Sequence, residues 1–250
     1  MTIVTLDEES QLMAPRCNLK LCILGGLALH TDELAAAPTT APEAQRLLAL
    51  LALRDRPVSR SAVAGTLWPD ATNQHAHASL RSALSRLRAP VREAIVITTT
   101  DLALSPAVSV DLRDARALAR RLLDKCATPS AADLSPDAIQ TLSVDCLPDW
   151  YEDWAIVESE EWRQLRLHAL DALSLRLSAA GRFSDAIAAA LAALRAEPLR
   201  ESACAALIRI HLAEGNQSEA IRTFERFRRI LARELHIEPT PALRALLEGF

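Results

Sequence analysis

The fold of the N-terminal half is decided by residues 59–88, SRSAVAGTLWPDATNQHAHASLRSALSRLR. This stretch predicts two helices joined by a polar turn, and Pro90 is expected to end the second helix. Apolar residues recur in the second helix at the spacing typical of a helix packed against a core. They are Ala76, Leu80, Ala83, Leu84 and Leu87. The opposite side carries short polar residues and arginines, so we predict one buried face and one cationic face.

The cationic face has the chemistry needed to bind DNA. Serine hydroxyls donate and accept hydrogen bonds, small side chains allow close approach, and a guanidinium matches a guanine edge or a phosphate. A charged helix face is more often only solvated. Residues 54–92, however, contain seven arginines against two aspartates, a local charge of +5 in a chain of net charge -4. We assign base contacts to Ser79, Ser82, Ser85 and Arg86, and phosphate contacts to Arg60, Arg81 and Arg88.

The segments around these helices predict the rest of an N-terminal domain. Residues 19–29, LKLCILGGLAL, alternate around two glycines, which indicates a short hairpin or two edge strands. Pro42 is expected to begin a helix with an apolar stripe, and Ser59 to cap the next helix. Residues 94–106, AIVITTTDLALSP, predict strand, turn and strand. A hairpin directly after a DNA-binding helix is a wing.

The middle of the chain differs in charge from the N-terminal part. Residues 111–125 predict a linking helix with an apolar stripe. Residues 126–162 contain nine acidic residues and no lysine or arginine, so this segment should face away from DNA. It includes the aromatic run WYEDW at 150–154. Two interpretations are open: a solvated surface with the aromatic side chains packed inward, or a patch that docks another protein.

The last third of the chain contains an internal repeat. Residues 181–187, GRFSDAI, are echoed by residues 215–221, GNQSEAI. The offset between the two equals the period of tetratricopeptide helix pairs, about 34 residues. Pro198 and Pro239 lie seven residues further apart than this period, so the second outgoing helix should be seven residues longer. We predict three helix pairs over residues 159–249. Their core would contain Leu165, Leu170, Leu173, Leu191, Leu194, Leu207, Ile208 and Ile230.

Both halves resemble one known family, the SARP-type bacterial transcriptional activators. In the first half the resemblance is carried by LWPD at 67–70, SLR at 79–81 and LSRLR at 84–88. In the second half it is carried by YEDW, RAEPLRESA, HLAEGNQSEAI and IEPTPALRALLE, within residues 151–248, which resemble the bacterial transcriptional activator domain.

This resemblance implies an OmpR-type winged helix with a recognition helix in the major groove and a wing toward the minor groove. It also implies that two molecules bind together, as a homodimer on DNA, to directly repeated sites near promoters. The bound protein would then recruit RNA polymerase. The wing turn lacks the glycine-tyrosine pair and the arginine common among relatives. We therefore expect only phosphate contacts there, from Thr98, Thr99 and Thr100.

The expected fold is mainly α: a flexible tail at 1–18, a winged helix-turn-helix DNA-binding domain with small β-hairpins at 19–111, and a TPR-like α-helical repeat domain at 112–250. The expected function is sequence-specific regulation of transcription, with double-stranded DNA and RNA polymerase as partners. The alternative is a non-catalytic adaptor in which both halves bind protein and the basic helix docks an acidic partner. Binding to generic duplex DNA distinguishes the two.

Other function classes lack their motifs. The chain has no P-loop, no G-x-S-x-G, no H-E-x-x-H and no glycine-rich dinucleotide turn, so we expect no enzyme, no catalytic residue and no cofactor. The His75 and His77 side chains would point about 200° apart on a helix, and the five cysteines lack metal-ligand spacing. No apolar run reaches the roughly 18 residues that span a bilayer, and MTIVTLDEES lacks signal-peptide features. We therefore expect a cytoplasmic protein without metal or membrane partner.

Overall fold

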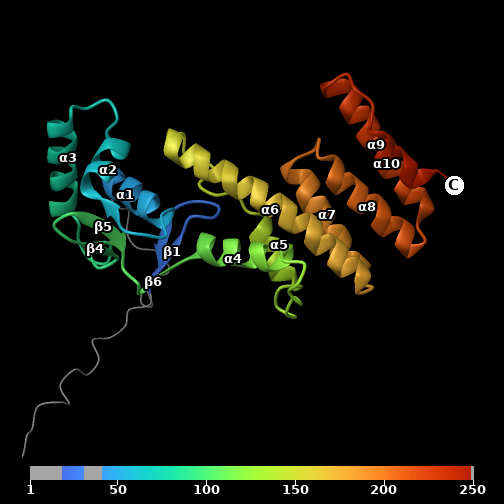
Figure 1. Ribbon diagram of the computed structural model, residues 1–250, viewed down its shortest axis with the longest axis horizontal. Helices are drawn as coiled ribbons and strands as arrows, with labels where there is room; N and C mark the ends of the chain where they lie inside the picture. Colours follow the sequence, from blue (N-terminus) through green and yellow to red (C-terminus); the bar gives the residue numbers. More distant parts are fainter. Residues whose placement is uncertain (1–18, 31–40, 249–250) are drawn as a thin grey trace, which may run out of the picture. The chain divides into compact units, whose positions relative to one another are not determined.

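The computed structural model describes residues 19–30 and 41–248 (Figure 1). The chain divides into two compact units, Met1–Asp111 and Leu112–Phe250. The tail predicted at residues 1–18 lies outside the described residues. Across the described ranges, no helix combines the length and the apolar character that crossing a membrane requires.

The first strands of the N-terminal unit form the predicted hairpin. Strand β1 (Leu19–Cys22) pairs antiparallel with β2 (Ala28–His30). A strand that the sequence did not predict, β6 (Val108–Val110), pairs in parallel with β1, so β1 is central rather than an edge strand. The Asp111 carboxylate accepts hydrogen bonds from the amides of Ile23 at 2.9 Å and Leu24 at 3.2 Å, and thereby fixes the hairpin to the end of the unit.

Three helices follow, and local capping signals set where they begin. They are α1 (Pro42–Ala52), α2 (Arg60–Leu67) and α3 (Asn73–Ser85). Pro42 is at the first turn of α1, as predicted, because a missing N–H costs nothing there. The Ser59 hydroxyl accepts from the Ala62 amide at 3.2 Å and the Thr72 hydroxyl from the His75 amide at 3.4 Å. The apolar stripe of α1 is buried.

The wing hairpin is also present. Strands β4 (Ile95–Ile97) and β5 (Asp101–Leu104) pair antiparallel, and the short β3 (Val58–Ser59) adds to the other edge of β5. Leu102 is fully buried and Val96 is 42% exposed, so one face of this sheet packs on the helices. The mainly α fold class with a winged helix is confirmed.

The C-terminal unit is helical. Its elements are α4 (Asp111–Leu123, whose first residue belongs to the other unit), α5 (Pro136–Ser143), α6 (Asp153–Ala179), α7 (Phe183–Ala196), α8 (Glu201–Glu214), α9 (Gln217–Glu234), α10 (Pro241–Arg244) and the 3-10 turn η1 (Ala245–Leu247). Gly181 and Gly215 follow α6 and α8 with φ of +72° and +87°. This left-handed conformation favours glycine and explains the internal repeat, whose two copies join α6 to α7 and α8 to α9.

The repeat is shorter than predicted. The structure forms two helix pairs, α6–α7 and α8–α9, and the expected third pair is reduced to α10 and η1. Helix α9 has 18 residues against 14 in α7, so it is four residues longer rather than seven. The other three residues of the predicted extension lie in the connection to Pro239. His236 has a φ of +57° there, and the following prolines cannot continue a helix.

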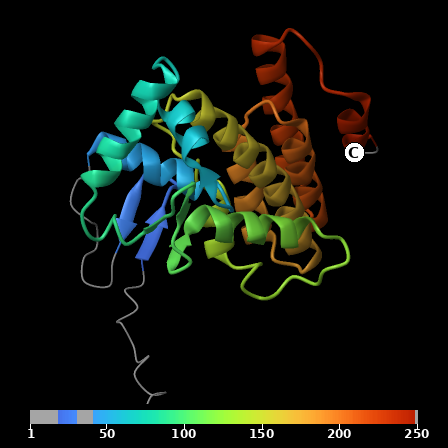
Figure 2. The same ribbon diagram turned by 60° about the vertical axis from the view of Figure 1, so that its left-hand side comes forward.

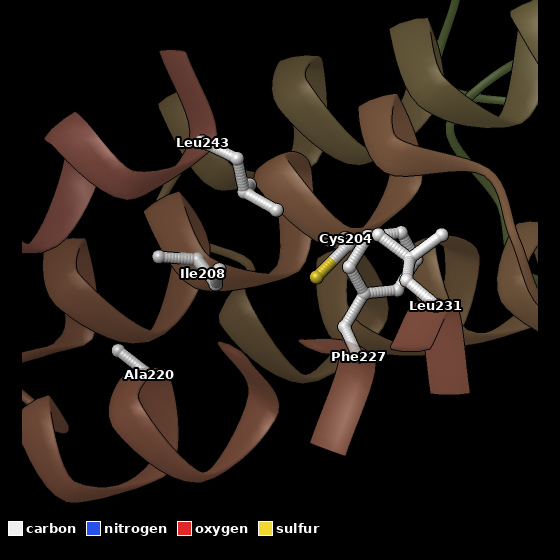
Figure 3. Packing of buried hydrophobic residues seen from close by; sticks show 6 residues of the cluster. All are labelled: Cys204, Ile208, Ala220, Phe227, Leu231 and Leu243. Carbon is white, nitrogen blue, oxygen red and sulfur yellow. The ribbon is translucent and has the colours of Figure 1, made fainter. Parts of the chain in front are cut away.

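The core of the last helices is closed by one cluster of side chains, of which Figure 3 shows Cys204, Ile208, Ala220, Phe227, Leu231 and Leu243. Predicted core residues Leu170, Leu173, Leu207 and Ile208 are buried. The prediction was wrong for Leu191, which is 37% exposed, and Leu165, Leu194 and Ile230 are only half-buried. Leu191, Leu194 and Ile230 line a groove of this unit, which leaves part of each side chain accessible.

At least four of the nine acidic residues of the middle segment pair with arginines of α4 and α6. Asp133 pairs with Arg121 at 2.7 Å, and Asp145 pairs with the buried Arg166. The rings of Trp150 and Trp154 meet edge to face at 5.8 Å and are partly buried. Tyr151, however, is 81% exposed, so the prediction that the aromatic residues pack inward was wrong for this residue.

Candidate nucleic-acid interface

Helix α3 has the two faces that its sequence predicts. It lies on the outer side of the N-terminal unit (Figures 1 and 2). Ala76, Leu80, Ala83 and Leu84 are buried against the core. Arg81, Ser82 and Ser85 are exposed on the other side, and Ser79 is half-buried. The helix contains no acidic residue, so its outer face presents hydroxyls and positive charge.

The helix ends earlier than predicted. It stops at Ser85, Arg86 is the C-cap, and Leu87 and Arg88 lie beyond it. Near this end the Ser85 hydroxyl donates to the Ser82 carbonyl at 3.0 Å, and serine side chains that bond to the backbone weaken helices. Pro90 also disfavours helical backbone at the residue before it. Arg88 is therefore exposed on the loop that follows α3 rather than on the helix itself.

Arg86 is held at the C-terminal end of α3. Its Nε donates to the Ser82 carbonyl at 3.1 Å, while the two terminal nitrogens of the guanidinium point to no acceptor within the described part of the chain. These terminal N–H groups form a fork that can bind a base edge or a phosphate. Ser82, Ser85 and Arg86 thus lie together on the last turn, with Ser79 one turn earlier. We call these four residues, together with Arg81, the recognition face.

The threonines of the wing turn are less available than expected. The Thr98 hydroxyl donates to the Asp101 carbonyl at 3.1 Å and accepts from the Asp101 amide at 2.9 Å. The Thr100 hydroxyl donates to the Asp101 carboxylate at 2.5 Å. Both hydroxyls therefore stabilise the turn itself. Thr99 is exposed and its hydroxyl is not engaged in this way, so it is the threonine best placed for a phosphate.

Arg60 lies against the wing, a contact that the sequence did not reveal. Its backbone amide donates to the Thr100 carbonyl at 2.8 Å, and its Nη1 donates to the Thr98 carbonyl at 3.2 Å. The pairing of β3 with β5 produces this contact because it places Ser59 opposite Asp101. The start of α2 and the wing turn therefore form one surface, with the positive charge of Arg60 beside Thr99.

Other arginines of the basic stretch have structural roles. The Arg92 guanidinium donates to the Ile95 carbonyl at 3.1 Å and braces the start of the wing. Outside that stretch, Arg46 donates to the Leu67 carbonyl at 2.8 Å and ties α1 to the end of α2. His77 shares a hydrogen bond of 3.3 Å with Ser61. Among the described residues, no group of three or more histidine, cysteine, aspartate or glutamate side chains is placed to hold a metal ion.

Comparison with known proteins places the C-terminal unit in a family. Residues 109–249 match the family model "Bacterial transcriptional activator domain". The chain is 30% identical over 247 residues to the regulatory protein AfsR of Streptomyces coelicolor, an alignment covering 91% of this chain and 24% of AfsR. It is 30% identical over 245 residues to the transcriptional regulatory protein EmbR of Mycobacterium tuberculosis, covering 92% of this chain and 63% of EmbR.

A solved structure shares the fold. It is Mycobacterium tuberculosis EmbR in complex with a low-affinity phosphopeptide, with a TM-score of 0.64 and 26% identity. The match covers 93% of this chain and 64% of that one, so the chain spans about a quarter of AfsR and just under two thirds of EmbR. The chain therefore belongs to the family with a bacterial transcriptional activator domain and, as its sequence predicted, to the SARP-type transcriptional activators.

Proposed function

We propose that this chain is a sequence-specific DNA-binding regulator of transcription, with α3 as its recognition helix. The observation that carries the proposal is the recognition face: exposed serines and arginines, together with the half-buried Ser79, on a helix that has no acidic residue and whose other face is buried. The names of AfsR and EmbR, a regulatory protein and a transcriptional regulatory protein, support the same role. A regulator that binds bacterial DNA acts in the cytoplasm.

The roles proposed for single residues follow their positions. Ser79, Ser82, Ser85 and Arg86 contact base edges in the major groove, where hydroxyls and guanidinium forks distinguish base pairs. Arg81, Arg88 and Arg60 contact phosphates, which fixes the register of the protein on the duplex. Of the wing threonines 98–100, Thr99 contributes most, since the other two hydroxyls are used within the turn.

The C-terminal unit is proposed to convert DNA binding into activation. By analogy with its family, we propose that paired molecules bind directly repeated sites and that the helical repeats contact RNA polymerase or the second molecule. No catalytic step is part of this proposal. The adaptor alternative assigns both halves to protein partners, and it predicts that the chain does not bind generic duplex DNA.

Salt-dependent binding tests the proposal against this alternative. The full chain is titrated into a fluorescent 30-base-pair duplex of arbitrary sequence at low salt, and the titration is repeated at rising salt. A regulator should bind the generic duplex, and its affinity should fall linearly with salt on a double logarithmic plot because phosphate contacts release counterions. No binding at low salt contradicts the proposal and favours the adaptor.

A further inference from the structure

A groove of about 570 Å³ runs through the C-terminal unit, between the helices coloured orange to red in Figure 1. Helix α8 packs against both α7 and α9, and forms the floor between them. Side chains of all three helices line the groove, among them Ile187, Leu191, Leu194 and Arg195 of α7, His211 of α8 and Arg226 of α9. This volume is within the range of roughly 300–1,000 Å³ typical of ligand sites.

Apolar side chains of α7 line this groove and are only partly covered by the rest of the protein. Ile187, Leu191 and Leu194 recur at helical spacing along α7, and Leu191 is 37% exposed. Leu194 also packs against the buried cluster of Figure 3, whereas Ile187 and Leu191 are not part of that cluster. Apolar surface collected in a concave site is typical of a place where another molecule binds.

The polar atoms of the groove indicate what kind of molecule binds. The Nδ1 atom of His211 is buried without a hydrogen-bond partner in the described part of the chain, so a bound backbone could satisfy it. Arg195 and Arg226 lie on opposite walls, are exposed, and form no ion pair with any described residue. The carboxylate of Glu219 is already paired with Arg222 at 2.6 Å. The groove therefore carries two uncompensated positive charges.

We propose that this groove binds a short amphipathic segment of a partner protein, with aliphatic side chains on one face and acidic residues beside them. Aliphatic anchors at helical spacing would cover the apolar stripe of α7, above all the exposed Leu191. Carboxylates would pair with Arg195 and Arg226, and a basic segment would be repelled. The proposal is independent of DNA binding, because every residue it uses belongs to the C-terminal unit.

Peptide selection tests the proposal. Random 16-residue peptides displayed on phage are selected on the full chain, and the enriched sequences are synthesised and titrated by fluorescence anisotropy. Enriched peptides should combine leucine, isoleucine or methionine at helical spacing with aspartate or glutamate. The double variant Arg195→Glu, Arg226→Glu should bind them about tenfold more weakly, since each exposed ion pair contributes modestly and each reversal adds repulsion. Leu191→Glu should weaken binding further.

Two variants serve as matched controls, and circular dichroism confirms that all variants fold. Arg209→Glu reverses an exposed arginine of α8 outside the groove, and Leu175→Glu changes an exposed leucine of α6; neither should alter peptide affinity.

The proposal is overturned if no peptide is enriched, if enriched peptides are basic, or if they bind Leu191→Glu as well as the natural chain. It is also overturned if the chain dimerises and Leu191→Glu separates the dimer, because a second copy then fills the groove. The DNA affinity of the groove variants is measured in parallel on the generic duplex. This measurement distinguishes a failure of the groove proposal, in which DNA binding is retained, from a failure of the DNA-binding proposal.

Discussion

Replacing Arg86 by alanine should remove sequence discrimination while leaving the fold intact. The Arg86 side chain is exposed, and its contact within the protein is the hydrogen bond of its Nε to the Ser82 carbonyl at 3.1 Å. A solvent-exposed hydrogen bond of this kind contributes little, so the free energy of unfolding should change by less than about 0.5 kcal/mol. The terminal N–H groups, by contrast, can make a bidentate contact to a base, which is worth about 1–3 kcal/mol of discrimination.

The assay compares two duplexes in competition. The preferred site of the natural chain is first obtained by selection from random duplexes, and each base pair is then replaced singly. For the natural chain, the base pair contacted by Arg86 should show a loss of affinity of roughly 5- to 150-fold, which is 1–3 kcal/mol. For Arg86→Ala, the preferred and the altered duplex should bind nearly equally at that position.

Arg86→Lys is the matched control, because lysine keeps the charge but lacks the planar fork. This variant should retain the natural salt dependence and still lose discrimination at the same base pair. The reasoning is refuted if Arg86→Ala discriminates at every position as strongly as the natural chain does.

Three further predictions follow from other parts of the structure. Arg81→Ala should weaken binding to all duplexes alike and reduce the slope of log affinity against log salt by about one, measured by titration at several salt concentrations; a loss confined to one base pair contradicts a phosphate contact. Hydrogen bonds from Arg121 lower the pKa of Asp133 to about 2, below its ordinary value of 3.8. The ionised carboxylate of Asp133 therefore stabilises the folded protein fully above pH 4, and this stabilisation is lost as pH falls toward 2. Because Arg121 is half exposed, Asp133→Asn should lower the unfolding free energy at pH 7 by about 1 kcal/mol, and urea unfolding should show this difference vanishing near pH 2. Phe227→Ala should cost about 3–5 kcal/mol in the same assay, since the ring is 4% exposed, and a cost below 1 kcal/mol contradicts its place in the core.

Periodicity in the sequence was enough to predict most of the helices. The stripe Ala76, Leu80, Ala83 and Leu84 and the stripe of α4 are buried as predicted, because a helix can bury only residues that share a face. Capping chemistry is equally local, so Pro42 and Ser59 marked the helix starts. The internal repeat was visible because Gly181 and Gly215 each adopt a left-handed conformation that favours glycine.

Features that depend on contacts between distant segments could not be predicted. Strand β6 forms because it pairs with β1, nearly ninety residues earlier, and its own residues, VSV, are too few to show periodicity. Arg60 was assigned to a phosphate, but its hydrogen bonds to the wing follow from the pairing of β3 with β5. Leu191 is apolar, as core residues are, and only the spacing of α7 and α9 places it in a groove.

The central claim is that the exposed side of α3 enters a DNA groove, and Ser82→Glu tests it most directly. Ser82 is exposed in the middle of the recognition face, and glutamate is a good helix former, so the substitution should leave the fold unchanged. The added carboxylate would face DNA phosphates and bases. In a selection from random duplexes, the natural chain should enrich a motif, repeated directly if molecules pair, and Ser82→Glu should enrich none. Enrichment of the same motif by both proteins would contradict the account.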